Sequence, residues 1–127
     1  MSRTILLIED NEQNRYLATY LLEQQGHRVL SAHDGPAGIE MARTLSPDLI
    51  LLDIQLPRMD GYAVARALRG IESLSRIPII AVTSYAMAGD REKTLAAGCN
   101  GYIEKPINPD TFAAEIERMA SAPPPTP

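Results

Sequence analysis

The segment Leu-Ile-Leu-Leu-Asp at residues 49–53 constrains the fold of this 127-residue chain more than any other feature. Four consecutive apolar residues suit a strand that is buried on both faces of a sheet. Pro57 prevents the strand from continuing, because proline has no backbone N–H to donate to a neighbouring strand. Asp53 is therefore expected at the carboxyl end of a central strand, the edge where open parallel sheets bind ligands.

Short apolar runs alternate along the chain with segments that carry helical periodicity. The predicted strands span residues 4–8, 28–32, 49–53, 78–82 and 101–104. The expected helix starts are Asn11, Gly35-Pro36, Asp60-Gly61, Asp90 and Asn108-Pro109. Such alternation predicts parallel strands joined by right-handed helical crossovers. The expected fold class is α/β, a flavodoxin-like doubly wound parallel sheet of five strands in the order 2-1-3-4-5, with five helices on both faces.

Apolar positions within these helices predict which side of each helix is buried. The expected inward-facing residues are Leu17, Leu21 and Leu22, then Gly38, Met41, Ala42 and Leu45, then Val64, Ala67, Leu68 and Ile71, and finally Phe112, Ile116 and Met119. Residues 1–120 are expected to form one domain. The proline-rich segment 121–127 lacks an apolar pattern and is expected to be a disordered tail.

The composition excludes several classes of function. The net charge is −4 and no Lys/Arg cluster stands out, so a surface for nucleic acid or anionic membrane is not expected. Cys99 is the only cysteine, which excludes an internal disulfide and fits a reducing compartment. The sequence contains neither a secretory signal nor a membrane-spanning run, so we expect a cytoplasmic protein.

Four of the five predicted strands end in polar residues that are able to bind a metal ion or a phosphate. Glu9 and Asp10 follow the first strand, Asp53 ends the third, Thr83 follows the fourth and Lys105 follows the fifth. In a parallel sheet these ends lie on one edge, so we expect the five side chains to converge. Glu9 and Asp10 can both reach the site only if the strand has ended before them.

Three neighbouring carboxylates repel one another unless a cation shares the site. Ligand sets made only of oxygen suit Mg²⁺, with Mn²⁺ as an alternative. The ammonium group of Lys105 and the hydroxyl group of Thr83 are both able to bind a phosphate. This combination of residues predicts Mg²⁺-assisted phosphoryl transfer with a carboxylate as the nucleophile.

The sequence resembles the receiver domain of bacterial two-component response regulators. The resemblance extends from residue 3 to about residue 119. It rests on Glu9-Asp10-Asn11, the run from Leu51 to Gly61, Val82-Thr83, and the segment Glu104 to Ile107. Residues 8–14 and 81–90 look most like a stand-alone cell-division receiver, and they also resemble receivers attached to hybrid histidine kinases.

The resemblance implies that Asp53 accepts a phosphoryl group from a histidine kinase or a histidine phosphotransfer protein. It further implies that Mg²⁺ is bound by Asp10, Asp53 and the backbone carbonyl of Gln55, with Glu9 acting largely through water. Lys105 would pair with the phosphate. Residues 1–120 would then form a phosphoacceptor domain that assists its own phosphorylation and dephosphorylation and does not turn over a separate substrate.

The resemblance also implies a conformational switch. Thr83 would turn inward to bond the phosphoryl group, and Tyr102 would swing toward the space that Thr83 leaves. The Lys105–Pro106 peptide would be cis. The output surface would be the face built from the fourth helix, the fifth strand and the fifth helix. Its partner would be a downstream protein, with the receiver a monomer or a weak phosphorylation-dependent dimer.

Residues beside the site are expected to tune its chemistry. By the same resemblance, Gln55 and Tyr85 would set how fast water removes the phosphoryl group. Ser84 stands where a smaller residue is frequent in the family, which would alter access to the phosphate.

Three other functions fit parts of the pattern. A phosphatase of the haloacid dehalogenase type needs a second Asp two positions after the nucleophile, and here that position is Gln55. A flavodoxin-like cofactor binder needs a phosphate loop after the first strand, where Glu9 and Asp10 would repel a phosphate. A metal-free scaffold used only for protein contacts would tolerate Asp53→Asn.

Overall fold

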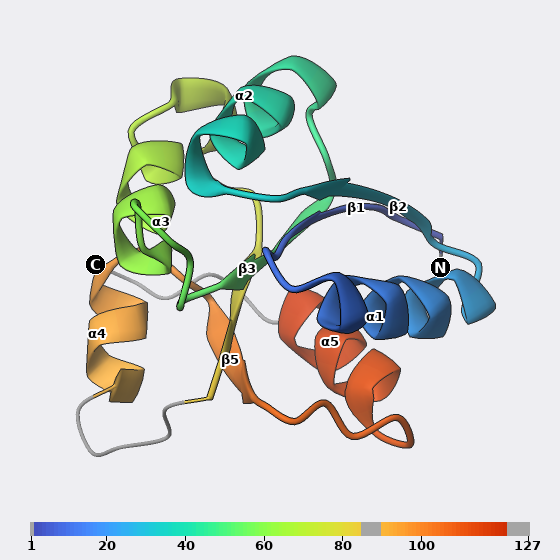
Figure 1. Cartoon of the computed structure of the whole chain (residues 1–127). Helices are drawn as coiled ribbons and strands as arrows, with labels where there is room; N and C mark the ends of the chain where they lie inside the picture. Colours follow the sequence, from blue (N-terminus) through green and yellow to red (C-terminus); the bar gives the residue numbers. More distant parts are fainter. Residues whose placement is uncertain (1, 85–89, 122–127) are drawn as a thin grey trace.

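A single twisted sheet of five parallel strands forms the centre of the molecule in the computed structural model, which describes residues 2–84 and 90–121. The strands are β1 (Thr4–Ile8), β2 (Arg28–Ala32), β3 (Leu49–Asp53), β4 (Ile79–Thr83) and β5 (Gly101–Glu104). Their order is β2-β1-β3-β4-β5, so the predicted fold class and strand order are confirmed (Figure 1).

Helices cover both faces of this sheet (Figure 1). They are α1 (Glu12–Gln24), α2 (Gly35–Leu45), α3 (Gly61–Arg69), the short 3₁₀ helix η1 (Glu72–Leu74), α4 (Asp90–Ala96) and α5 (Phe112–Ser121). α1 and α5 lie on one face, and α2, α3 and α4 lie on the other. The sheet is thus enclosed, which leaves its edges as the places where polar groups from the strands can meet solvent.

The central strand β3 is buried on both faces, as its apolar run predicted. Successive side chains of a strand point to opposite faces. Leu49 and Leu51 therefore pack with α1 and α5, while Ile50 and Leu52 pack with α2 and α3. All four side chains have no exposed surface. The position of Asp53 at the end of this strand is consequently fixed by burial on both sides.

Capping residues set the starts of α1 and α3, the helices that follow β1 and β3. The side chain of Asn11 accepts a hydrogen bond from the Asn14 N–H, and the side chain of Asp60 accepts one from the Ala63 N–H. Both bonds satisfy amides that a helix start leaves without intrahelical partners. Gly26, just past the end of α1, has a φ of +87°, the left-handed conformation that glycine adopts readily at a helix terminus.

Some predicted boundaries were wrong. α5 begins at Phe112, and Asn108 caps the turn that leads into it: its side chain accepts from the Asp110 N–H, and its carbonyl accepts from the Phe112 N–H at 3.0 Å. α5 ends at Ser121, one residue into the predicted tail, and residues 122–127 lie outside the described residues. The 3₁₀ helix η1 was not predicted.

Two predicted buried faces also needed correction. Leu45 is 48% exposed, because it is the last residue of α2 and the chain turns away at Ser46 in the left-handed conformation. The inner face of α1 is centred on Ala18 and Leu22, and Leu17 is only half-buried. These differences leave the positions of the strand ends unchanged.

Candidate functional site

The carboxyl ends of four strands bring the predicted site residues to one edge of the sheet. β1 ends just before Glu9, so Glu9 and Asp10 both reach the site, as the sequence required. Asp53 is the last residue of β3 and Thr83 is the last residue of β4. Lys105 directly follows β5, and its backbone N–H donates to the Thr83 carbonyl at 2.8 Å.

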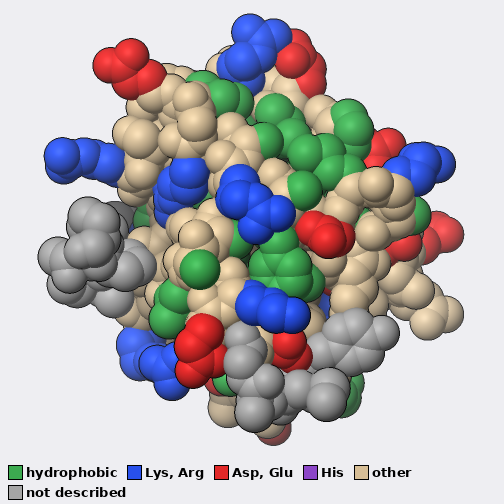
Figure 2. Space-filling view, turned by 90° about the vertical axis from the view of Figure 1, so that its left-hand side faces the viewer, with side chains coloured by type: hydrophobic (Ala, Val, Ile, Leu, Met, Phe, Trp, Pro, Cys, Tyr) green, Lys and Arg blue, Asp and Glu red, His purple; other side chains and the backbone are tan. Residues whose placement is uncertain are grey.

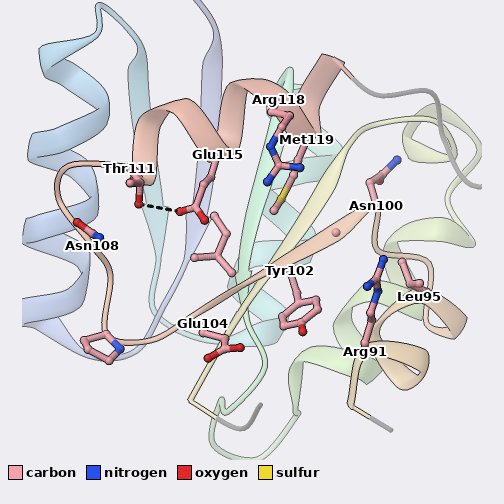
Figure 3. A pocket seen from close by; sticks show the side chains of 13 residues that line it. Arg91, Leu95, Asn100, Tyr102, Glu104, Asn108, Thr111, Glu115, Arg118 and Met119 are labelled. Atoms are coloured by element: carbon pink, nitrogen blue, oxygen red, sulfur yellow. Dashed lines mark hydrogen bonds between the residues drawn. The ribbon is translucent and has the colours of Figure 1, made fainter. Parts of the chain in front are cut away.

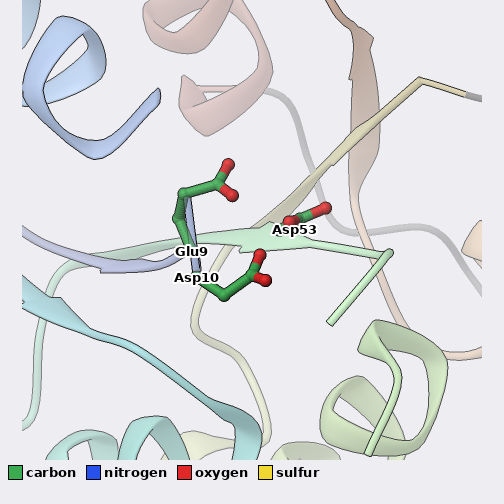
Figure 4. A group of neighbouring side chains, drawn as sticks. All are labelled: Glu9, Asp10 and Asp53. Carbon is green, nitrogen blue, oxygen red and sulfur yellow. The ribbon is translucent and has the colours of Figure 1, made fainter. Parts of the chain in front are cut away.

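Three carboxylates form the centre of this edge (Figure 4). Glu9, Asp10 and Asp53 each offer one oxygen, and these oxygens lie within 4.8 Å of one another. Glu9 and Asp53 are almost fully buried, while Asp10 is exposed. A donor set made only of carboxylate oxygens, open to solvent on one side, matches the ligands that Mg²⁺ prefers.

Lys105 supplies a positive charge to the two buried carboxylates. Its Nζ atom lies 3.0 Å from Glu9 Oε1 and 3.4 Å from Asp53 Oδ2. One ammonium group faces three carboxylates, so the local charge stays negative. A cation at the exposed Asp10 side would complete the neutralisation.

Backbone amides hold the buried carboxylates in place. The Gln55 N–H donates to Asp53 Oδ1 at 2.9 Å, and the Asn11 N–H donates to Glu9 Oε2 at 3.2 Å. Burial, together with a hydrogen bond to Asp53, raises the pKa of Glu9 to about 7, and Lys105 opposes that rise. The protonation of Glu9 is therefore sensitive to the charges placed beside it.

A second contact connects the loops after β3 and β4. The Ser84 N–H donates to Gln55 Oε1 at 3.1 Å, so the side chain of Gln55 bridges to the residue that follows Thr83. Ser84 is exposed. Tyr85, the other predicted tuning residue, lies outside the described residues. The Lys105–Pro106 peptide is cis, as predicted.

A family model described as the response regulator receiver domain matches residues 5–117. The chain belongs to the response regulator receiver family. The polar-differentiation response regulator DivK of Brucella ovis is 41% identical over 117 residues, which cover 92% of this chain and 95% of that protein. DivK of Brucella anthropi is 40% identical over the same shares of both chains. This receiver accordingly belongs to two-component signalling, and its predicted likeness to a cell-division receiver is confirmed.

Solved structures agree with this assignment. The chemotaxis response regulator CheY4 of Vibrio cholerae superposes with a TM-score of 0.89 at 25% identity, covering 94% of this chain and 99% of that one. The receiver domain of a sensor histidine kinase from Pseudomonas aeruginosa superposes with a TM-score of 0.86 at 37% identity, covering 96% and 100%. That receiver was solved with a magnesium ion coordinated in its active site cleft. Membership in this family favours the receiver over the phosphatase and cofactor-binder alternatives.

Tyr102 stands on β5 beside a cavity of about 600 Å³ between α4, β5 and α5 (Figure 3). The ring is half-buried and packs against the core on the α3 side. Arg91 and Leu95 of α4 line the cavity opposite Glu115 of α5. The predicted switch residue of the receiver therefore borders the face predicted to carry its output.

The outer surface around α3 and α4 carries charges of both signs. Figure 2, which looks onto this side of the receiver, shows Lys and Arg interspersed with Asp and Glu, and hydrophobic side chains exposed between them. Such a mixture is ordinary for a protein surface and does not by itself mark an interface. Within the described residues, no helix is long and apolar enough to cross a membrane.

Two residues near the site had no predicted role. A Cβ atom on Gly61 would lie 2.5 Å from Ile54 Cα, so the loop after β3 can close only over glycine. Arg15 donates through Nη1 to the backbone carbonyls of Glu9 and Asp10. The Asp60-Gly61 pair could have indicated that the loop needs glycine at residue 61, whereas nothing in the sequence pattern indicates the contacts of Arg15.

Proposed function

We propose that this receiver accepts a phosphoryl group on Asp53 from a histidine kinase or a histidine phosphotransfer protein, in a reaction that requires Mg²⁺. The observation that carries the proposal is the group of Glu9, Asp10 and Asp53 within 4.8 Å, with the ammonium of Lys105 3.4 Å from Asp53. A buried carboxylate is suited to attack phosphorus when it lies beside an ammonium group and beside two further carboxylates that can bind a metal ion.

The residues present fit a Mg²⁺ site. Asp10 and Asp53 would be direct ligands together with the backbone carbonyl of Gln55, and Glu9 would act through water. Glu9 suits the indirect role because the Lys105 Nζ atom lies closer to Glu9 Oε1, at 3.0 Å, than to Asp53 Oδ2, at 3.4 Å. When bound, Mg²⁺ would neutralise the carboxylates and the phosphoryl oxygens that approach them.

The transfer itself is a displacement at phosphorus. An oxygen of Asp53 forms a bond to phosphorus while the bond from phosphorus to the donor histidine nitrogen breaks, and that nitrogen keeps the electron pair. Lys105 is positioned to pair with a phosphoryl oxygen, because its Nζ atom already lies beside Asp53 Oδ2. Thr83 would donate its hydroxyl to another phosphoryl oxygen.

The phosphoryl group then acts as a ligand that shifts the receiver between two conformations. Thr83 would turn toward the phosphoryl group and Tyr102 would follow it, which changes the cavity between α4, β5 and α5. A downstream protein would read that face. Protein contact would then be the output, with the receiver a monomer or a weak phosphorylation-dependent dimer.

Intact mass spectrometry after incubation with acetyl phosphate and Mg²⁺ tests the proposal. We expect one phosphoryl adduct that is lost in EDTA and absent from Asp53→Asn. Asp110→Asn is the matched control, because Asp110 is an exposed aspartate in the turn before α5. An adduct that persists in Asp53→Asn would overturn the assignment of the acceptor.

Release of phosphate separates the remaining outcomes. If the parent shows no adduct and releases no phosphate from the donor, the metal-free scaffold is correct and the proposal fails. If it releases phosphate without an adduct, quenching in acid within milliseconds must trap the adduct. Failure to trap any adduct would contradict the aspartyl phosphate.

A further inference from the structure

The side chain of Arg15 is hydrogen-bonded to the backbone of Glu9 and Asp10, two acids of the proposed Mg²⁺ site. Its Nη1 atom donates to the Glu9 carbonyl at 2.9 Å and to the Asp10 carbonyl at 3.0 Å. Arg15 lies in the first turn of α1, where its backbone N–H bonds to the Asn11 carbonyl. One planar guanidinium therefore connects the start of the helix to the loop that carries both carboxylates.

We infer that Arg15 is a positioning residue that holds Glu9 and Asp10 in the orientation needed to bind Mg²⁺. The inference rests on the proposed function of the site. A carbonyl fixed by a hydrogen bond fixes its whole peptide plane, and the side chains on either side of that plane are oriented with it. Partners that orient ligands from outside the coordination shell often change metal affinity about 10- to 100-fold when they are removed.

The need for such a support differs between the two acids. Glu9 is buried, and its carboxylate is already held by Lys105 and by the Asn11 N–H. Asp10 is exposed, so its direction depends on the backbone of the loop. Arg15 supports that backbone from the helix side and contacts the carbonyl of each acid.

A purely electrostatic role for Arg15 makes the opposite prediction. A cation next to an acidic site weakens binding of a second cation, so removing it would tighten Mg²⁺ binding. Among the described residues, no carboxylate forms a salt bridge with Arg15. The contacts are with carbonyl oxygens, which favours orientation over charge pairing.

Mg²⁺ titration by calorimetry on the full chain separates the two roles. We expect Arg15→Met to weaken binding by about tenfold. Arg15→Lys retains the charge without the planar fork, so it should also bind less tightly than the parent. Arg43→Met is the matched control, since Arg43 pairs with Glu40 on the exposed side of α2 and its loss changes the net charge equally. Arg43→Met should match the parent.

Hydrogen exchange of the metal-free proteins gives a second readout. Amides of residues 9–15 should exchange faster in Arg15→Met than in Arg43→Met, while amides of β3 stay unchanged. Unchanged or tighter Mg²⁺ binding by Arg15→Met would overturn the inference. If Arg15→Met does not fold, parent-like Mg²⁺ binding by Arg15→Lys would overturn it. A parent that binds no Mg²⁺ would instead overturn the proposed function.

Discussion

The ammonium nitrogen of Lys105 lies 3.0 Å from Oε1 of Glu9, and both side chains are largely withdrawn from solvent. Proximity to an ammonium group alone would lower the pKa of Glu9. Burial outweighs it, and with the hydrogen bond to Asp53 it raises the pKa from 4.5 to about 7. The metal-free site therefore holds a proton on Glu9 at pH values where an ordinary glutamate has lost it.

This raised pKa predicts how stability depends on pH in the absence of metal. The folded state binds more protons than the unfolded state between pH 4.5 and about 7, so the free energy of unfolding should fall as pH rises through that range. We expect the free energy of unfolding of the parent to fall by about 1–3 kcal/mol over this range, and we expect this fall to be absent from Glu9→Gln. Urea unfolding in EDTA at pH 5 and pH 8 measures it. His27, whose pKa is lowered by burial, contributes equally to both proteins. Parallel pH profiles would contradict the prediction.

Gln55 is expected to protect the phosphoryl group from water. Its side chain accepts from the Ser84 N–H and so bridges the two loops beside the site. Gln55→Ala removes the bridge and should shorten the lifetime of the aspartyl phosphate by about two- to tenfold, the effect of one hydrogen bond. Loss of the adduct after removal of the donor is followed by intact mass. The control is Gln24→Ala at the exposed end of α1. A lifetime equal to or longer than that of the parent would refute the protective role.

Gly61 is expected to be irreplaceable for steric reasons. A Cβ atom there would lie 2.5 Å from Ile54 Cα and 2.6 Å from the Asp53 carbonyl oxygen, both rigid backbone atoms. Gly61→Ala should cost about 3 kcal/mol in the free energy of unfolding and displace Asp53. Gly70→Ala, at the other end of α3, meets nothing closer than 3.4 Å and should be within about 1 kcal/mol of the parent. Equal urea midpoints for the two variants would contradict the steric account.

The sequence predicted the strand ends well because burial and topology both act on them. The run before Asp53 is apolar at every position, which is possible only for a strand covered on both faces. Alternation with helices made the sheet parallel, and parallel strands bring their carboxyl ends together. Convergence of Glu9, Asp53 and Lys105 followed from those two facts alone.

Local signals were less complete for the loops and long side chains. Asn108, followed by proline, has the pattern of a helix cap, and its side chain accepts from the Asp110 N–H as a cap does, yet the regular α-helix begins only at Phe112. The contacts of Arg15 could not be predicted at all. A long side chain that bonds to carbonyl oxygens leaves no periodicity, and its partners become known only when the loop is folded.

Arg69, at the opposite end of the sheet, likewise makes contacts that the sequence does not predict. Its guanidinium donates four hydrogen bonds, to the carbonyls of Leu74, Ile77 and Gly98 and to Asn100 Oδ1. All four acceptors are neutral, and burial lowers the pKa of Arg69. These bonds join the end of α3 to η1 and to the turn between α4 and β5.

We expect Arg69→Met to lower the free energy of unfolding by about 3 kcal/mol, because it leaves acceptors in the interior without donors. Arg69→Lys should recover little of that loss, since a single ammonium cannot reproduce the fork. Arg66 lies one turn earlier in α3 and is exposed, so Arg66→Met should change stability by no more than about 0.5 kcal/mol. Urea unfolding of the three variants measures these differences. If Arg69→Met and Arg66→Met unfold at the same midpoint, the four bonds contribute nothing net to stability.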